Sequence, residues 1–136
     1  MSSYPYTLTF YSYKGGVGRT LLAANLGLLR SRRGKTLLWD LDIEAPGMHR
    51  IPALIPASPV ERGFFEWLID WQAQPAKALP DYPALVALAR QSPKAEKLYV
   101  LPAFGESADF AALYQQINWN AFLVDDFPRG LKLFRD

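Results

Sequence analysis

Residues 11–20 read YSYKGGVGRT, and this stretch decides how the rest of the chain is interpreted. An apolar, β-prone run over residues 7–13 leads into the glycines, and a run with helical periodicity over residues 21–32 follows them. Strand, glycine-rich turn and helix, in this order, is the setting that a phosphate-binding loop requires. The sequence therefore predicts a central strand over residues 7–13, an anion-binding turn and a helix that packs on the sheet.

The glycines supply the physical reason for this interpretation. Without a Cβ atom, a glycine adopts positive φ at little cost and lets a phosphate come close to the backbone. The amide groups of the turn can then point inward as an anion nest, and the following helix adds its positive N-terminal end. The candidate phosphate-binding residues are Gly15, Gly16, Val17, Gly18, Arg19 and Thr20. The plainer alternative is a glycine-rich turn that binds nothing.

The motif departs from the standard G-x-x-x-x-G-K-[ST] loop at three positions. Tyr13 stands at the first glycine position, Arg19 stands at the usual lysine position, and Lys14 lies inside the loop. This combination resembles the deviant Walker A motif of the ParA/MinD-type ATPases, K-G-G-V-G-K-[ST]. It is most similar to the subgroup in which arginine replaces the last lysine. The resemblance is good over residues 7–48 and weak beyond them.

This resemblance implies an α/β fold, the three-layer P-loop NTPase sandwich with a mainly parallel sheet. Domains of that family are considerably longer than 136 residues. We therefore expect residues 1–136 to form a single nucleotide-binding domain that is incomplete or truncated. A fragment, a split gene product and a degenerate module completed by a partner all remain open at this point.

The second informative stretch begins with residues 36–40, TLLWD, which read as a buried parallel strand. Asp40 and Asp42 follow its apolar part and should emerge at the same sheet edge as the phosphate loop. Carboxylates there would repel phosphate unless Mg²⁺ or a positioned water lies between them. Alternatively, both carboxylates cap the strand and the next turn through local backbone hydrogen bonds.

The resemblance also assigns roles and ligands, namely ATP and Mg²⁺. Thr20 would bind Mg²⁺, Asp40 would support the metal shell, and Asp42 would orient the attacking water. Lys14 would reach across a two-fold interface to the phosphates of a second subunit. The implied function is Mg²⁺-dependent ATP hydrolysis coupled to dimerisation or partner switching. The rival is a nucleotide sensor or protein-interaction module that has lost catalysis.

A further acid is needed to hold Mg²⁺, and the sequence permits two interpretations. In one, residues 121–124 form a strand and Asp125 is the Walker B carboxylate that contributes to the metal site. In the other, residues 118–122 form a helix and the chain stops before that acid arrives. The second interpretation is preferred, because the arginine-variant relatives carry a similar helix-forming stretch upstream of Walker B.

Two predicted helices carry most of the remaining apolar residues. Leu22, Leu26 and Leu29, with Leu21, Ala24 and Leu28 beside them, form a broad apolar face by which the first helix should pack on the sheet. Ala23, Ala24 and Gly27 keep this helix slim and should allow close approach. Residues 64–71, FFEWLIDW, form an aromatic amphipathic helix that is core or, alternatively, a docking face for another chain.

Composition narrows the class of protein. Half of the 136 residues are hydrophobic and 14% are aromatic, which is enough for a packed core. The chain has no cysteine, and no apolar stretch reaches the ~18 residues of a membrane span. The net charge of +2 does not by itself indicate a nucleic-acid partner. We therefore expect a cytoplasmic protein without a membrane segment.

Overall fold

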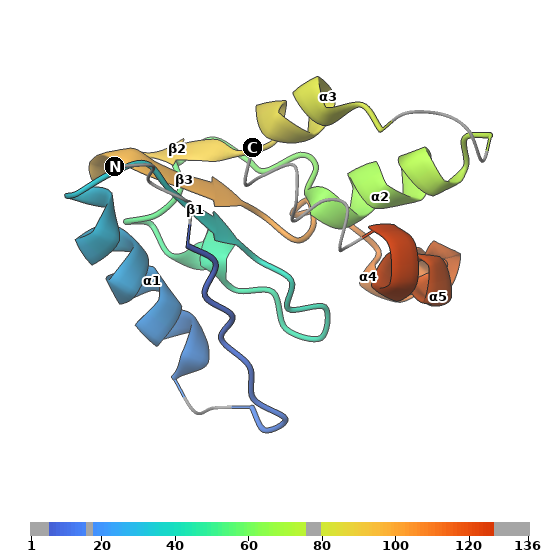
Figure 1. Ribbon diagram of the computed structural model, residues 1–136, viewed down its shortest axis with the longest axis horizontal. Coiled ribbons are helices and arrows are strands. Elements are labelled where there is room, and N and C mark those ends of the chain that lie inside the picture. Colours follow the sequence, from blue (N-terminus) through green and yellow to red (C-terminus); the bar gives the residue numbers. More distant parts are fainter. Residues whose placement is uncertain (1–5, 16–17, 76–79, 127–136) are drawn as a thin grey trace.

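The computed structural model of the chain describes residues 6–15, 18–75 and 80–126. Three strands form one sheet in the order β1-β3-β2, and helices lie on both of its faces (Figure 1). In chain order the elements are α1 (Arg19–Ser31), β1 (Thr36–Trp39), the 3₁₀ turn Met48–Arg50, α2 (Phe64–Gln72), α3 (Tyr82–Ala87), β2 (Arg90–Ser92), β3 (Ala95–Leu101), α4 (Phe110–Gln116), α5 (Trp119–Ala121) and the π-helical turn Phe122–Asp126.

The sheet contains one parallel and one antiparallel pair of strands. β1 runs parallel to β3, from Thr36 opposite Leu98 to Trp39 opposite Leu101. The amide of Asp40 extends this ladder with a 3.0 Å hydrogen bond to the Leu101 carbonyl. β2 pairs antiparallel with β3 and carries a register shift. The predicted strand over residues 36–40 is thus confirmed, but its parallel partner is β3 and not residues 7–13.

The predicted P-loop NTPase sandwich is wrong for the described residues. A small mixed sheet of three strands has too few strands for that fold, and only one of its two pairings is parallel. The described chain is α/β only in a weak sense, with helices around a small sheet. The physical reason is that the expected central strand makes no ladder, so β1 remains at the edge of the sheet.

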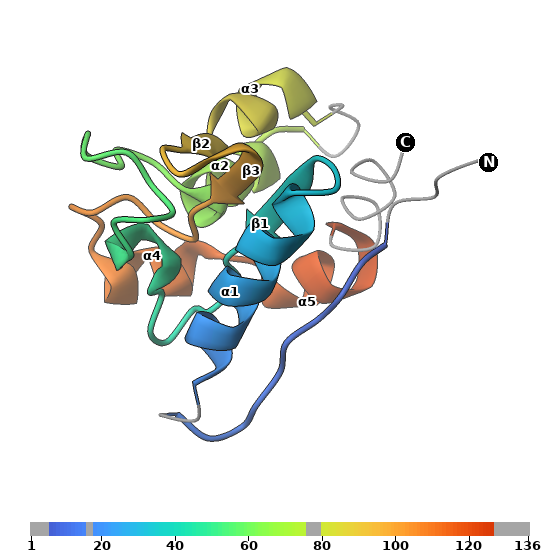
Figure 2. The ribbon, with the colours of Figure 1, turned by 90° about the vertical axis from the view of Figure 1, so that its left-hand side faces the viewer.

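The segment over residues 7–13 is extended without being a strand. Figure 2 shows it as a ribbon that runs past α1 to the helix N-terminus and carries no strand arrow. Tyr6, Leu8 and Tyr11 expose 87%, 66% and 81% of their surface. Alternating β-prone residues give a segment its extended shape, but a strand also needs a neighbouring edge with which to share hydrogen bonds. Sequence pattern alone does not supply that neighbour.

Helix α1 packs on the sheet by the small residues of the predicted face and not by Leu21, Leu22 and Leu29. Its buried residues are Ala23, Ala24, Gly27 and Ser31, whereas Leu21, Leu22 and Leu29 are exposed. A methyl group added to Gly27 would lie 2.8 Å from the side chain of Leu38, so the helix and β1 are in close contact there. The small residues allow the helix backbone to approach the sheet closely, as predicted, and Leu28 packs beside them against the same cluster.

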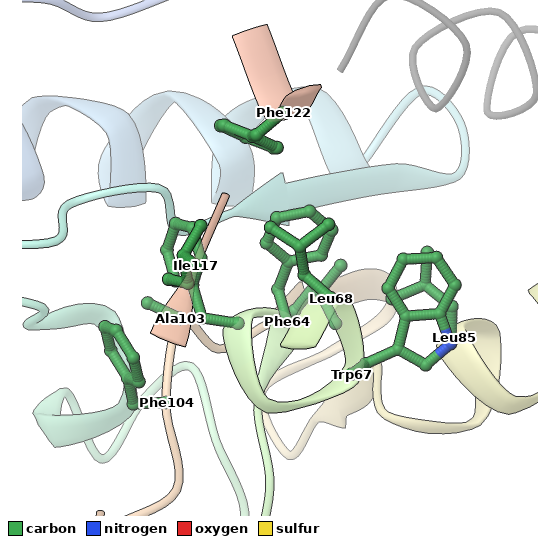
Figure 3. Packing of buried hydrophobic residues seen from close by; sticks show 10 residues of the cluster. Phe64, Trp67, Leu68, Leu85, Ala103, Phe104, Ile117 and Phe122 are labelled. Atoms are coloured by element: carbon green, nitrogen blue, oxygen red, sulfur yellow. The ribbon is translucent and has the colours of Figure 1, made fainter. Parts of the chain in front are cut away.

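The opposite face of the sheet carries an aromatic core. We use this name for the buried cluster Phe64, Phe65, Trp67, Leu68, Leu85, Leu101, Ala103, Phe104, Ile117 and Phe122. Figure 3 shows these side chains converging from α2, α3 and the segments around α4 and α5. Phe65 is fully buried and stacks on Phe104, with ring centroids 5.0 Å apart. The aromatic helix over residues 64–71 is therefore core.

Hydrogen bonds attach the start of α2 to the chain that leaves β3. The amides of Phe64 and Phe65 donate to the carbonyls of Pro102 and Ala103, at 2.8 and 2.9 Å. The Glu66 carboxylate accepts from the amide of Gly63 at 2.9 Å and from that of Gly105 at 2.7 Å. These bonds satisfy amides that a helix N-terminus leaves without intrahelical partners.

Candidate functional site

The N-terminus of α1 follows the glycine-rich loop and carries no side-chain cap. Gly18 is the residue before the helix and has φ of 79°, a left-handed conformation that glycine adopts without steric cost. The first turn contains no acidic residue. The loop residues Gly16 and Val17 lie outside the described residues. The described start of α1 thus has neither a side-chain cap nor an acidic residue in its first turn.

Arg19 is the residue that links the loop to the rest of the site. Its Nη2 atom forms an ion pair with Oδ2 of Asp42, at the turn that follows β1. Its Nη1 atom donates to the carbonyl of Ser12 at 3.1 Å and to the Ser12 hydroxyl at 3.0 Å. One guanidinium therefore connects three parts of the chain, namely α1, the extended segment before the loop and the turn after β1.

Asp42 lies in a turn that is held by its own hydrogen bonds. Its Oδ1 atom accepts the amide of Ala45 at 3.1 Å, while Oδ2 faces Arg19. The side chain of Asp42 is 20% exposed and that of Arg19 is 28% exposed. The pair is therefore partly open to solvent.

Asp40 has a different environment, although it is only two residues away. It is 3% exposed, and its two oxygens accept the amides of Asp42 at 3.0 Å and of Gly47 and Met48 at 3.2 Å each. Burial raises the pKa of the Asp40 carboxyl above its ordinary value of 3.8, although the three amide donors act in the opposite direction. Asp40 therefore anchors the turn through hydrogen bonds to local backbone amides, which is the alternative that the sequence had left open for this residue.

Thr20 and Lys14, at the two ends of the loop in sequence, differ in exposure. Thr20 is half-buried, and a methyl group built on Gly47 would lie 3.7 Å from its Cγ2 atom. Thr20 therefore faces the turn that Asp40 anchors. Lys14 and Gly15 are exposed, and the Lys14 carbonyl accepts the Ser12 hydroxyl at 3.0 Å.

Asp125 is not at the end of a strand. Residues 119–126 are helical, first as α5 and then as a π-helical turn, and Asp125 is exposed on it. The interpretation that made residues 121–124 a strand is therefore wrong, and the helix interpretation of this stretch is right. The ion pair of Arg19 is with Asp42, and Asp125 takes no part in it.

Mg²⁺ would have few protein ligands here. Within residues 6–15, 18–75 and 80–126, no group of three or more His, Cys, Asp or Glu residues is arranged to hold a metal ion. Mg²⁺ in nucleotide sites is commonly bound by one or two protein oxygens together with phosphate oxygens. Thr20 has a hydroxyl of the kind that such a donor set uses. Both oxygens of Asp40 already accept amide groups, and Asp42 accepts the Ala45 amide at Oδ1 and Arg19 at Oδ2, so a metal at Asp42 would share an oxygen with one of these donors.

The sequence analysis missed the part that Ser12 plays. Ser12 accepts twice from Arg19, through its carbonyl and its hydroxyl. The predicted strand over residues 7–13 would have used the Ser12 carbonyl in a sheet ladder, whereas in the structure that carbonyl accepts a hydrogen bond from Arg19. A hydroxyl residue directly before a glycine-rich loop was the available signal, because such side chains bond readily to nearby groups.

Comparison with known proteins adds no relative to this description. No protein-family model, no curated protein and no solved structure matches the chain. In the described part of the chain, no helix has the length and apolar character needed to cross a membrane.

Proposed function

We propose that the loop over residues 14–20 binds the polyphosphate chain of a nucleotide, and that ATP with Mg²⁺ is the ligand. The observation that carries this proposal is the contact between Arg19, from the loop, and Asp42, from the end of the neighbouring strand. A cation fork suited to phosphate oxygens and a carboxylate suited to a metal or water thus occur side by side. The resemblance of the motif to ParA/MinD-type loops supports the same ligand.

In this proposal each residue has a limited task. Gly15, Gly16, Val17 and Gly18 offer backbone amides to the phosphates, and Arg19 binds the β/γ oxygens. Thr20 and Asp42 would hold Mg²⁺, which neutralises charge on the phosphates when it is bound. Asp40 acts by holding the turn that carries Asp42. Catalysis of this kind depends on positioning and charge neutralisation, and Asp42 would orient the attacking water.

A non-hydrolysing nucleotide sensor is the second candidate, and one observation favours it. Asp125, the candidate Walker B acid, is exposed on a helix rather than placed at a strand end beside the loop. A site without that acid can still bind phosphate through amides and Arg19. It would lack a carboxylate that hydrolases of this type use to hold the metal.

Calorimetry of Arg19→Gln tests the binding proposal. We expect wild-type protein to bind ATP–Mg²⁺ and Arg19→Gln to bind about a hundredfold more weakly, because a charge-assisted contact is lost. The matched control is Arg30→Gln, an exposed arginine in the last turn of the same helix, which should bind like wild type. Equal weakening in both variants would mean that only overall charge matters. Phosphate release then separates the two candidates, because a sensor binds without turnover.

Light scattering tests the proposed role of Lys14, whose position before the first glycine is exposed. With a slowly hydrolysed ATP analogue, the mass of wild-type protein should double and that of Lys14→Ala should not. An unchanged wild-type mass would remove the dimer from the proposal but leave nucleotide binding intact.

A further inference from the structure

We propose that a hollow between α4 and the turn after β1 binds an organic cation, namely a guanidinium group on an alkyl chain. The hollow has a volume of about 340 Å³ and is lined by Glu44, Phe110, Ala111, Tyr114 and Gln115. Glu44 comes from the turn, and the other four residues come from α4. None of them belongs to the loop over residues 14–20, so this inference goes beyond the proposed function and does not depend on it.

The lining residues supply the chemistry that recognises a cation. The faces of aromatic rings such as Phe110 and Tyr114 carry partial negative charge and attract cations. The carboxylate of Glu44 adds a full negative charge at the same hollow. Among the described residues, no lysine or arginine lines the hollow, and Glu44 forms no ion pair. The negative charge of the hollow is therefore left for a ligand, and it favours a cation over a neutral molecule or an anion.

The aromatic wall is fixed before any ligand arrives. The Phe110 ring packs edge-on against Phe104 of the aromatic core, with centroids 5.3 Å apart. The Tyr114 ring lies 4.9 Å from the ring of Trp119, whose indole N–H donates to the Tyr114 carbonyl at 3.2 Å. Tyr114 is nevertheless 46% exposed, so part of its surface remains for a ligand. A wall that is already ordered lowers the entropic cost of binding.

The wall that carries Glu44 is held by hydrogen bonds on both sides of this residue. Asp42 accepts the amide of Ala45 at 3.1 Å, and Asp40 accepts the amide of Gly47 at 3.2 Å. The backbone of Glu44 is thus held in place, while its side chain is exposed. A guanidinium suits this pair of walls better than an ammonium group does. It is planar and weakly hydrated, so it can stack on an aromatic ring and donate two hydrogen bonds to a carboxylate at the same time.

NMR titration of the backbone amides with n-butylguanidinium tests the proposal. The matched ligand is n-butylurea, which has the same shape without the charge. We expect wild-type protein to bind n-butylguanidinium with a Kd of about 1 mM, and n-butylurea at least about tenfold more weakly. Glu44→Gln and Tyr114→Leu should each weaken binding of the cation about fivefold, by loss of the ion pair or of the cation–π contact. The matched control is Glu96→Gln, an exposed residue of β3, which should change the affinity less than about twofold.

A short peptide with one central arginine distinguishes two sources of the same group. Binding about tenfold tighter than that of n-butylguanidinium would support the site and identify the ligand as a side chain of a partner protein. Equal or weaker binding of the peptide, with n-butylguanidinium still bound, would support the site and identify the ligand as a small cation.

Several outcomes would overturn the proposal. They are equal binding of n-butylurea and n-butylguanidinium, wild-type affinity in Glu44→Gln, an equal loss in Glu96→Gln, and the absence of saturable shift changes. The shift changes must also include amides of α4 around Tyr114, and changes confined to other parts of the chain would assign the ligand elsewhere. If Tyr114→Leu does not fold, Glu44→Gln and the two ligands on wild-type protein decide the matter, because Glu44 is exposed and its replacement leaves the packing intact.

Discussion

The two faces of the sheet are covered by different kinds of residue. On the α2 face, the aromatic core buries large rings that contact one another at centroid distances of 5.0–6.1 Å. On the α1 face, small residues pack against Leu38, and polar contacts among Ser12, Arg19 and Asp42 join the loop to the sheet edge. We call this second set of contacts the loop edge. Dense apolar packing resists change, whereas a partly exposed ion pair contributes little to stability.

The difference suggests a division of labour. The aromatic core contributes most of the free energy of unfolding, because buried aromatic side chains remove the largest apolar areas from water. The loop edge contributes little stability but carries the groups that can meet a phosphate. Substitutions in the two regions should therefore separate stability from binding.

The largest effect is expected at the centre of the aromatic core. Phe65→Ala should lower the free energy of unfolding by about 4 kcal/mol, because the side chain is completely buried and its removal would leave a cavity. Urea denaturation followed by circular dichroism measures this loss. Phe65→Leu fills more of the space and should cost about 1 kcal/mol. A loss below about 1 kcal/mol for the alanine variant would contradict the claim that the aromatic core contributes most of the free energy of unfolding.

An intermediate effect is expected at Asp40, which lies at the loop edge but is buried. Asp40→Ala should lower the free energy of unfolding by about 2 kcal/mol, because three amides lose their acceptor. It should also weaken ATP binding, since Asp42 sits on the turn that these amides define. Urea denaturation and calorimetry on the same sample measure both effects. If Asp40→Ala kept both the free energy of unfolding and the ATP affinity of wild type, Asp40 would not hold the turn.

The pH dependence of stability gives a second readout of Asp40. Burial raises the pKa of this carboxyl in the folded state, so the folded protein holds the proton more tightly than the unfolded chain does. The stability contributed by Asp40 is therefore fully present below its ordinary pKa of 3.8, and it is lost as pH rises through the folded pKa. The free energy of unfolding of wild type, relative to that of Asp40→Asn, should fall across that window. A rise there would contradict the assignment.

The smallest effect is expected on the outer face of α1. Leu22 is 59% exposed, so Leu22→Gln should change the free energy of unfolding by less than about 0.5 kcal/mol. Ala24→Leu, at a buried position of the same helix, is the matched contrast and should cost about 2 kcal/mol by overpacking. Thermal unfolding of both variants makes the comparison. A large loss for Leu22→Gln would show that the outer face of α1 is covered in solution.

The sequence by itself determined the elements whose causes are local. The helices α1 and α2 follow from apolar periodicity over consecutive turns, and β1 follows from a short apolar run. The aromatic helix was predicted as core or, because its aromatics are dense for a short helix, as a docking face, and its burial confirms the core interpretation. The meeting of Arg19 and Asp42 at one edge also followed from chain order, because a loop before α1 and a turn after β1 lie at the same end of this unit.

Only the tertiary structure decided which edges and faces are used. Residues 7–13 have a strand-like pattern, yet pairing depends on a neighbour that is distant in sequence, and β1 pairs with β3 instead. The burial of Ala24 rather than Leu22 on α1 depends on how closely the helix approaches Leu38. Asp40 and Asp42 look alike in sequence, but one is enclosed by amides and the other faces an arginine. Local patterns fix helices and turns because their hydrogen bonds are local, whereas sheet order, helix facing and the environment of a carboxylate depend on contacts between remote residues.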